Sequence, residues 1–88
     1  MRQLRNLDGI GEKMMADFAL LGIGAVDQLA AADPDELYER LCLITKARQD
    51  PCVLDVFRCA AAQARDPGLP AEQRNWWWWS RARKADAG

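Results

Sequence analysis

The sequence has no histidine, and its 88 residues include only one serine, Ser80, and one threonine, Thr45. The missing imidazole excludes a histidine general base, a His-activated serine or cysteine nucleophile, and a histidine metal ligand. So few hydroxyl groups also leave few candidates for nucleophilic catalysis. We therefore predict that the protein is not an enzyme.

Long apolar runs and an excess of one charge are also missing. No stretch approaches the roughly 18 apolar residues that a membrane-spanning helix needs. The amino-terminal residues are basic but lack the apolar segment of a secretory signal, so we expect a cytoplasmic protein. The formal net charge is −1. Any attraction to nucleic acid must therefore come from a local basic surface.

Side chains branched at Cβ are scarce. Isoleucine, valine and threonine together supply seven residues, whereas alanine and leucine supply 25. This bias favours helices over strands and predicts an all-α fold, a compact bundle of about five short helices. We expect residues 1–79 to form the domain and residues 80–88 to be a basic, disordered tail.

Two Asp-Pro pairs predict helix starts, because Asp caps a helix and Pro suits its first turn. The first pair, Asp33-Pro34, begins a helix to about Lys46 whose apolar face includes Ile44. The second pair, Asp50-Pro51, begins a helix over residues 51–65 that is apolar around most of its circumference. Such a helix is buried on most sides, so we predict that it is the central helix.

A Gly-Ile-Gly turn follows the basic amino-terminal segment. Residues 4–21 resemble a helix-hairpin-helix motif, in which this turn precedes a helix that carries a lysine. Gly9 and Gly11 leave backbone N–H groups uncovered at the positive end of that helix. Ile10 plugs the turn into the core, and Lys13 reaches toward a phosphate. In families with this motif, the assembly holds the DNA backbone without reading the base sequence.

Two carboxylates flank this turn. Asp8 stands where the motif often has proline, and Glu12 begins the following helix. Both carboxylates oppose the binding of an anion at the turn. The alternative interpretation is therefore that the hairpin only connects two helices.

Four further segments together resemble one protein family. They are residues 21–30, 33–42 and 50–60 and the tryptophan run 76–79. In this order they resemble the small bacterial pathogenicity-locus proteins, often labelled mitomycin resistance proteins, over residues 3–79. The resemblance implies an all-α fold that contains a helix-hairpin-helix and is similar to the carboxy-terminal domain of competence regulators. It implies no settled activity, but the resistance label suggests a link to DNA damage, because mitomycin crosslinks DNA.

Three cysteines, Cys42, Cys52 and Cys59, lack the spacing of a metal site, since there is no Cys-x-x-Cys pair and no histidine. Cys52 and Cys59 are about 10.5 Å apart along one helix, too far for a disulfide. We predict free thiols that pack as small apolar side chains, with no metal and no cofactor.

Four consecutive tryptophans are the most unusual feature: Trp76, Trp77, Trp78 and Trp79. They cannot all face one side of a helix, so we expect one or two to remain partly exposed. Residues 74–84 also carry four positive charges and no acid, namely Arg74, Arg81, Arg83 and Lys84. Aromatic side chains beside cations suit stacking on unpaired bases, and they also suit protein–protein contacts.

Two functions remain open from the sequence. The first is a DNA-binding module without sequence specificity, whose hairpin and basic tail contact phosphates. Its predicted DNA-binding residues are Gly9, Ile10, Gly11, Lys13, Arg81, Arg83 and Lys84. The second is a protein-interaction adaptor, or a homodimer, with a purely structural hairpin. Its predicted interaction surface is Arg74 with Trp76, Trp77, Trp78 and Trp79.

Overall fold

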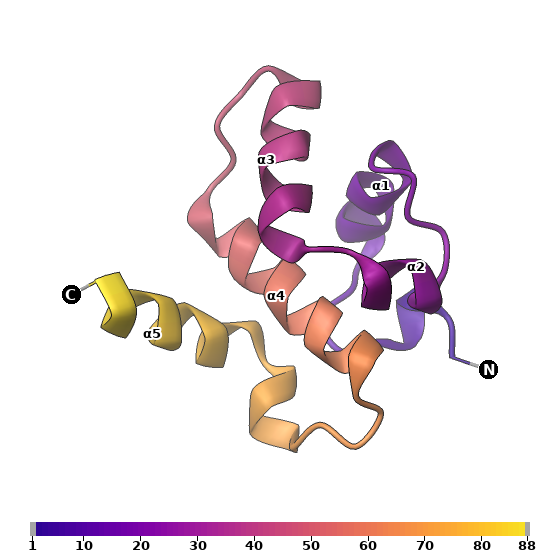
Figure 1. The fold of residues 1–88 in the computed structure, drawn as a ribbon, viewed down its shortest axis with the longest axis vertical. Helices are drawn as coiled ribbons and strands as arrows, with labels where there is room; N and C mark the ends of the chain where they lie inside the picture. The colour runs from indigo at the N-terminus through magenta and orange to yellow at the C-terminus, as the bar shows by residue number, and fades with distance from the viewer. Residues whose placement is uncertain (1, 88) are drawn as a thin grey trace.

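The computed structural model describes residues 2–87, which contain helices, turns and loops but no strand (Figure 1). The all-α prediction is confirmed. The elements are η1 (Leu4–Asn6), α1 (Glu12–Leu20), α2 (Val26–Ala31), α3 (Pro34–Thr45), α4 (Pro51–Arg65), η2 (Ala71–Arg74) and α5 (Trp76–Ala87), where η is a 3-10 helix. Within this part of the chain, no helix is both long and apolar enough to cross a membrane.

Helix α4 lies at the centre, and α2, α3 and α5 all pack against it (Figure 1). Its residue Phe57 is fully buried and stacks on Phe18 of α1, with 5.3 Å between the ring centroids. The small residues Ala60 and Ala61 are also fully buried, which lets neighbouring elements approach the helix closely. The prediction that residues 51–65 form the central helix is confirmed.

The two Asp-Pro pairs begin α3 and α4 as predicted. The Asp33 carboxylate accepts a hydrogen bond from the Asp35 N–H at 2.9 Å, and the Asp50 carboxylate accepts one from the Cys52 N–H at 2.8 Å. These bonds satisfy N–H groups that have no partner within the helix. Helix α3 then ends beside Lys46, which has a left-handed backbone with φ of 56°.

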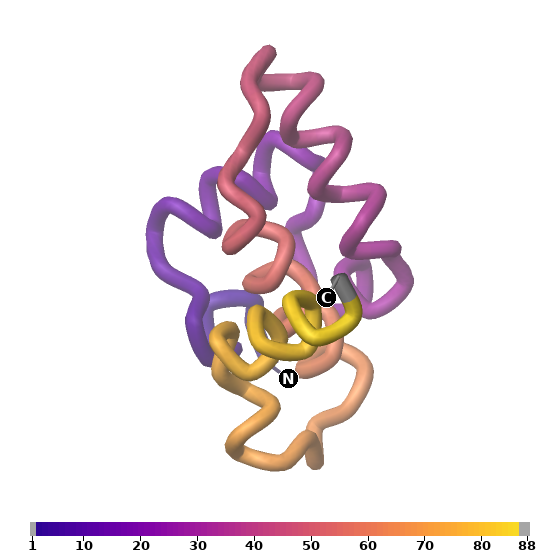
Figure 2. The backbone as a smooth tube through the Cα atoms, turned by 90° about the vertical axis from the view of Figure 1, so that its left-hand side faces the viewer, coloured from indigo at the N-terminus to yellow at the C-terminus, as the bar shows by residue number. Residues whose placement is uncertain are grey.

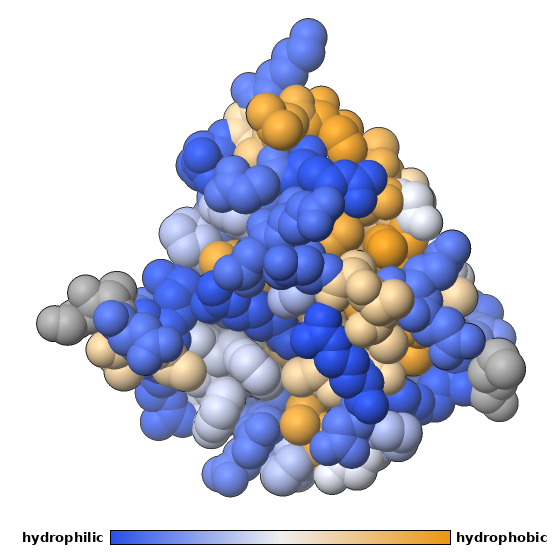
Figure 3. Space-filling view, in the orientation of Figure 1, coloured by the Kyte–Doolittle hydropathy of each residue, from blue (hydrophilic) through white to orange (hydrophobic). Residues whose placement is uncertain are grey.

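The far end of α3 is more exposed than its sequence pattern suggests. Ile44, predicted on the apolar face, is exposed, and so is Leu43 beside it. Figure 1 shows the last turns of α3 projecting beyond the neighbouring helices, and Figure 3 shows apolar surface at that end. A periodic pattern identifies a helix face, but burial also requires a neighbouring element that reaches far enough.

Residues 80–87 differ from the disordered tail predicted for residues 80–88. They continue α5, and Gly88 lies outside the described residues. Ser80 is buried, and Arg83 binds the buried carboxylate of Asp55 in α4. Figure 2 shows α5 lying across the front of α4. Tertiary contacts of this kind stabilise a polar helix that would be only marginally stable on its own.

Candidate functional site

The turn at residues 7–11 requires glycine at one position. Gly9 has φ of +85°, in the left-handed region that disfavours a side chain. Gly11 has an extended backbone that any residue adopts. At both glycines, an added Cβ would have no atom within 4 Å. Gly9 therefore makes the turn, whereas Gly11 leaves the backbone open to approach from solvent.

The elements on either side of the turn are unequal in length. Before it lies only the single 3-10 turn η1, and after it lies the nine-residue helix α1. Leu4 and Leu7 are buried, and Ile10 packs half-buried against the same core. These three apolar side chains fix the turn against the body of the protein.

The amino-terminal end of α1 has no side-chain cap. Gly11 is the N-cap residue, and no side chain accepts a hydrogen bond at this end of the helix. The first N–H groups of an α-helix have no partner within the helix. Because the helix dipole gives this end a partial positive charge, it is suited to binding an anion.

Lys13 lies in the first turn of α1 and 76% of its side chain is exposed, while its Nζ lies 3.4 Å from the Asp17 carboxylate. The Asp17 side chain is only 12% exposed, whereas the Lys13 ammonium reaches solvent and the pair is long. Lys13 is therefore within reach of a phosphate at the start of the helix, but such a contact competes with its ion pair to Asp17.

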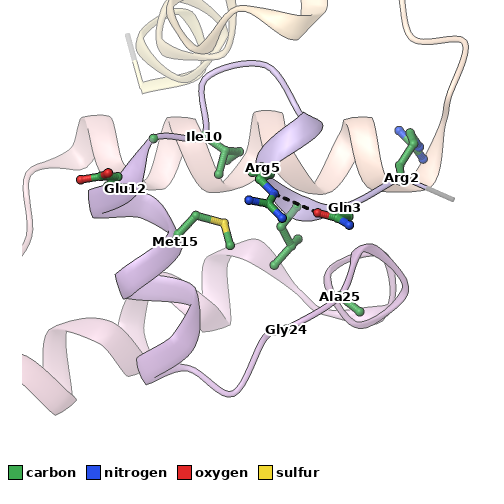
Figure 4. Close-up of a pocket in the computed structure, with 10 residues that line it drawn as sticks. Arg2, Gln3, Arg5, Ile10, Glu12, Met15, Gly24 and Ala25 are labelled. Carbon is green, nitrogen blue, oxygen red and sulfur yellow. Dashed lines mark hydrogen bonds between the residues drawn. The ribbon is translucent and has the colours of Figure 1, made fainter.

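An open groove of about 1000 Å³ runs beside this helix end (Figure 4). It is lined by η1, the Gly-Ile-Gly turn, α1 and the loop between α1 and α2. Ile10 and Met15 supply apolar side chains to its lining, and Gly11 also lines it. The helix end thus opens onto a concave surface.

Two arginines that the sequence pattern did not single out also line this groove. Arg5 donates a hydrogen bond from Nε to the Gln3 Oε1 at 2.9 Å, and the pair is exposed. Arg2 instead donates to the carbonyl oxygens of Gln63 at 2.8 Å and Ala64 at 3.2 Å, at the end of α4. Arg5 is therefore the more available cation. The only signal for it was the basic character of the first residues.

The two flanking carboxylates are placed differently from each other. Glu12 lines the groove, but Figure 4 shows its carboxylate pointing away from Arg5 and Met15. Asp8 lines a separate cavity of about 120 Å³. Its carboxylate lies 3.5 Å from the Arg74 Nε. The negative charge of Asp8 is thus partly compensated by Arg74.

The tryptophan run divides into two pairs. Trp76 and Trp77 are exposed by 41% and 44%, as predicted for one or two of the four. Trp78 and Trp79 are half-buried and meet edge to face, with 5.1 Å between ring centroids. The Trp79 Nε1–H also donates to the Gln73 carbonyl at 2.8 Å. The second pair anchors the start of α5, and the first pair remains on the surface.

The three basic residues of α5 have different surroundings. Arg83 binds Asp55, which is fully buried, through two hydrogen bonds of 2.9 and 3.1 Å. These bonds raise the pKa of Arg83. Arg83 is therefore occupied within the fold, contrary to its prediction as a DNA-binding residue. Arg81 lies over the Trp77 ring at 4.5 Å, and Lys84 is exposed. Neither lines the groove beside α1.

The cysteines are free and serve packing. Cys42 and Cys59 are buried and Cys52 is half-buried, which confirms the prediction of free thiols. Burial raises the pKa of the Cys59 thiol, so this thiol stays protonated at neutral pH. The described residues contain no group of three His, Cys, Asp or Glu that could hold a metal ion.

Comparison with known proteins agrees with the resemblance seen in the sequence. The family described as Pathogenicity locus (Cdd1) matches residues 1–85. A relative, the mitomycin resistance protein McrB of Streptomyces lavendulae, is 41% identical over 81 residues, which cover 92% of this chain and 73% of that protein. No solved structure matches the chain. The chain belongs to the pathogenicity-locus family.

Proposed function

We propose that this protein is a DNA-binding module of the helix-hairpin-helix type, which holds the phosphate backbone without reading the base sequence and takes part in resistance to mitomycin. The observation that carries the proposal is the uncapped N-terminus of α1, which opens onto the groove. In this proposal the protein acts in the cytoplasm by binding and is not an enzyme.

The proposed contact has two parts. The N–H groups at the start of α1 donate hydrogen bonds to a phosphate, and the open backbone at Gly11 allows the phosphate to approach. Lys13, in the first turn of α1, and Arg5, which lines the groove, then contribute positive charge. Contacts to phosphates give affinity and position, but they carry no sequence information.

The link to resistance is supported by the relative from Streptomyces lavendulae, whose name describes a mitomycin resistance protein. Mitomycin crosslinks DNA, and a protein that acts at such damage needs affinity for DNA in many sequence contexts. Backbone binding without base contacts meets that requirement.

Fluorescence anisotropy with a labelled blunt duplex at low salt tests the proposal. We expect Lys13→Glu to weaken binding about tenfold or more, because the substitution reverses a charge beside the bound phosphate. Lys46→Glu is the matched control, since Lys46 is exposed, carries the same charge and lies at the carboxy-terminal end of α3, outside the first turn of α1. We expect the control to change the affinity much less.

Two results would overturn the proposal. One is that the wild-type protein fails to bind the duplex at low salt, and the other is that both substitutions weaken binding equally. Either result would favour the structural interpretation of the hairpin. The exposed Trp76 and Trp77 would then be the candidate surface of a protein-interaction adaptor or a homodimer.

A further inference from the structure

We infer that Trp76, Trp77 and Arg81, named here the tryptophan platform, stack on an unpaired base, so that the preferred ligand is DNA in which a single strand continues from a duplex. The inference rests on the proposed function of the hairpin and specifies its class of ligand. The hairpin holds phosphates, and the platform adds a contact that only an unstacked base can make.

The platform is exposed because its neighbours carry the packing. Trp78 and Trp79 contact each other, and the Trp79 indole is hydrogen-bonded to the Gln73 carbonyl. That anchor fixes the first turn of α5. Trp76 and Trp77 are left 41% and 44% exposed on a fixed backbone. An exposed aromatic side chain has only two rotatable bonds, so it loses little conformational entropy when a flat ligand stacks on it.

Arg81 gives the platform its charge. Its guanidinium lies 4.5 Å from the centroid of the Trp77 ring, in a cation–π contact. Because Asp55 compensates Arg83, the exposed cations of α5 are Arg81 and Lys84. Arg81 covers one face of the Trp77 ring, so a base stacks on the other face or on the guanidinium itself. In either position its phosphates come close to positive charge.

This charge favours a nucleic acid over a protein as the occupant. Residues 74–84 contain no acid. Protein–protein contacts enrich Trp and Arg, but they are depleted of lysine, and the exposed Lys84 lies on the same helix. A polyanion with flat apolar faces complements both features of the platform, and proteins that bind single strands combine aromatic rings with basic residues in this way.

The hairpin and the platform are connected in the fold. Asp8 of the hairpin turn lies 3.5 Å from Arg74 in η2, and Trp76 follows two residues later. The longest dimension of the molecule is 34 Å. A single strand of about ten stacked nucleotides covers that length, at about 3.4 Å for each nucleotide. One DNA molecule is therefore long enough to contact both surfaces.

Anisotropy titrations with three probes test the inference. The probes are a blunt duplex, the same duplex with a single-stranded overhang of about twelve nucleotides, and that overhang with abasic sites in place of its bases. We expect the wild-type protein to bind the normal overhang about tenfold more tightly than the blunt duplex, which is the gain from about one stacked base. The abasic overhang should lose this gain.

Variants separate stacking from structure. Trp77→Ala should remove the preference for the overhang and leave the affinity for the blunt duplex unchanged, and Trp77→Phe should restore part of the preference. Leu43→Ala is the matched control, because Leu43 is an exposed apolar residue on α3. Arg81→Glu, which keeps both indoles, should also reduce the preference if Trp77→Ala does not fold.

Three binding results would each overturn the inference. They are equal wild-type affinity for the blunt and overhang probes, equal affinity for the normal and abasic overhangs, and an equal loss for all probes in Trp77→Ala. Dissociation of a dimer by Trp77→Ala in sedimentation equilibrium, with unchanged DNA binding, would also overturn it and identify a protein interface. Absence of binding to the blunt duplex would instead overturn the proposed function of the hairpin.

Discussion

The side-chain amide of Gln63 holds the backbone of Asp8 at both of its polar groups. Gln63 Oε1 accepts a hydrogen bond from the Asp8 N–H at 2.8 Å, and Gln63 Nε2 donates one to the Asp8 carbonyl at 3.0 Å. Gln63 is buried in the central helix, and the two residues are 55 positions apart. A long-range contact with the most central element therefore fixes the turn at residues 7–11.

Gln63→Leu removes both bonds while keeping a similar side-chain size. We expect it to lower the free energy of unfolding by about 2 kcal/mol, because the Asp8 backbone loses its hydrogen-bond partners. Urea denaturation measures this change. Gln63→Glu keeps the acceptor for the Asp8 N–H and should be less destabilising when the new carboxyl is protonated. An unchanged free energy of unfolding in Gln63→Leu would show that water replaces the amide at no cost.

Arg83→Ala should destabilise the protein more than Asp55→Ala. The first substitution leaves a fully buried carboxylate without its partner, whereas the second leaves an arginine that already reaches solvent. We expect Arg83→Ala to lower Tm by about 10 °C or more. Thermal melts followed by circular dichroism compare the two variants. Equal melting temperatures would contradict the asymmetry.

Acid should destabilise the protein through the caps and ion pairs of α3 and α4. The hydrogen bond from Arg58 lowers the pKa of Asp35 from its ordinary value of 3.8. The hydrogen bond from the Cys52 N–H likewise lowers the pKa of Asp50 from 3.8. Each carboxylate thus stabilises the fold fully above pH 3.8, and this contribution is lost as the pH falls through the lower folded-state pKa.

Melting temperatures measured across this acidic range check the prediction. The wild-type Tm should fall as the pH decreases below the ordinary aspartate pKa. A protein with both Asp35→Asn and Asp50→Asn should start from a lower Tm and show a shallower dependence on pH. Parallel curves for the two proteins would contradict the assignment to these carboxylates.

Asp8→Asn should strengthen DNA binding. The substitution removes a negative charge near the hairpin and keeps the N–H that Gln63 accepts. We expect a gain of several-fold at low salt that shrinks as salt increases, since the effect is electrostatic. Asp8→Pro removes the same charge but also the N–H, so it should lower Tm. Anisotropy and thermal melting of both variants separate these effects.

Local rules in the sequence predict much of the fold. Asp33 and Asp50 cap helices because each precedes a proline, and that signal needs no information about distant residues. The apolar circumference of residues 51–65 likewise identifies the central helix. The burial of a residue such as Ile44 cannot be predicted from nearby residues, because it depends on how far the neighbouring helices extend.

The site was predictable only in part for the same reason. Gly9, Gly11 and Lys13 lie within one short segment, so the turn and the following helix could be inferred. The role of Arg83 was not predictable, because its partner Asp55 lies 28 positions away in another helix. The hydrogen bonds between the Gln63 side chain and the Asp8 backbone join residues 55 positions apart, and no sequence pattern indicates them. Tertiary packing alone determines these partnerships.

Amide chemical shifts test the central claim most directly. A blunt duplex is titrated into isotopically labelled wild-type protein at low salt, and the backbone N–H signals are followed by NMR. The account predicts that the largest shifts occur at residues 11–14, where the N–H groups at the start of α1 meet the phosphate. Unchanged amide signals at residues 11–14, or changes confined to the projecting end of α3, would contradict the claim that the start of α1 binds DNA.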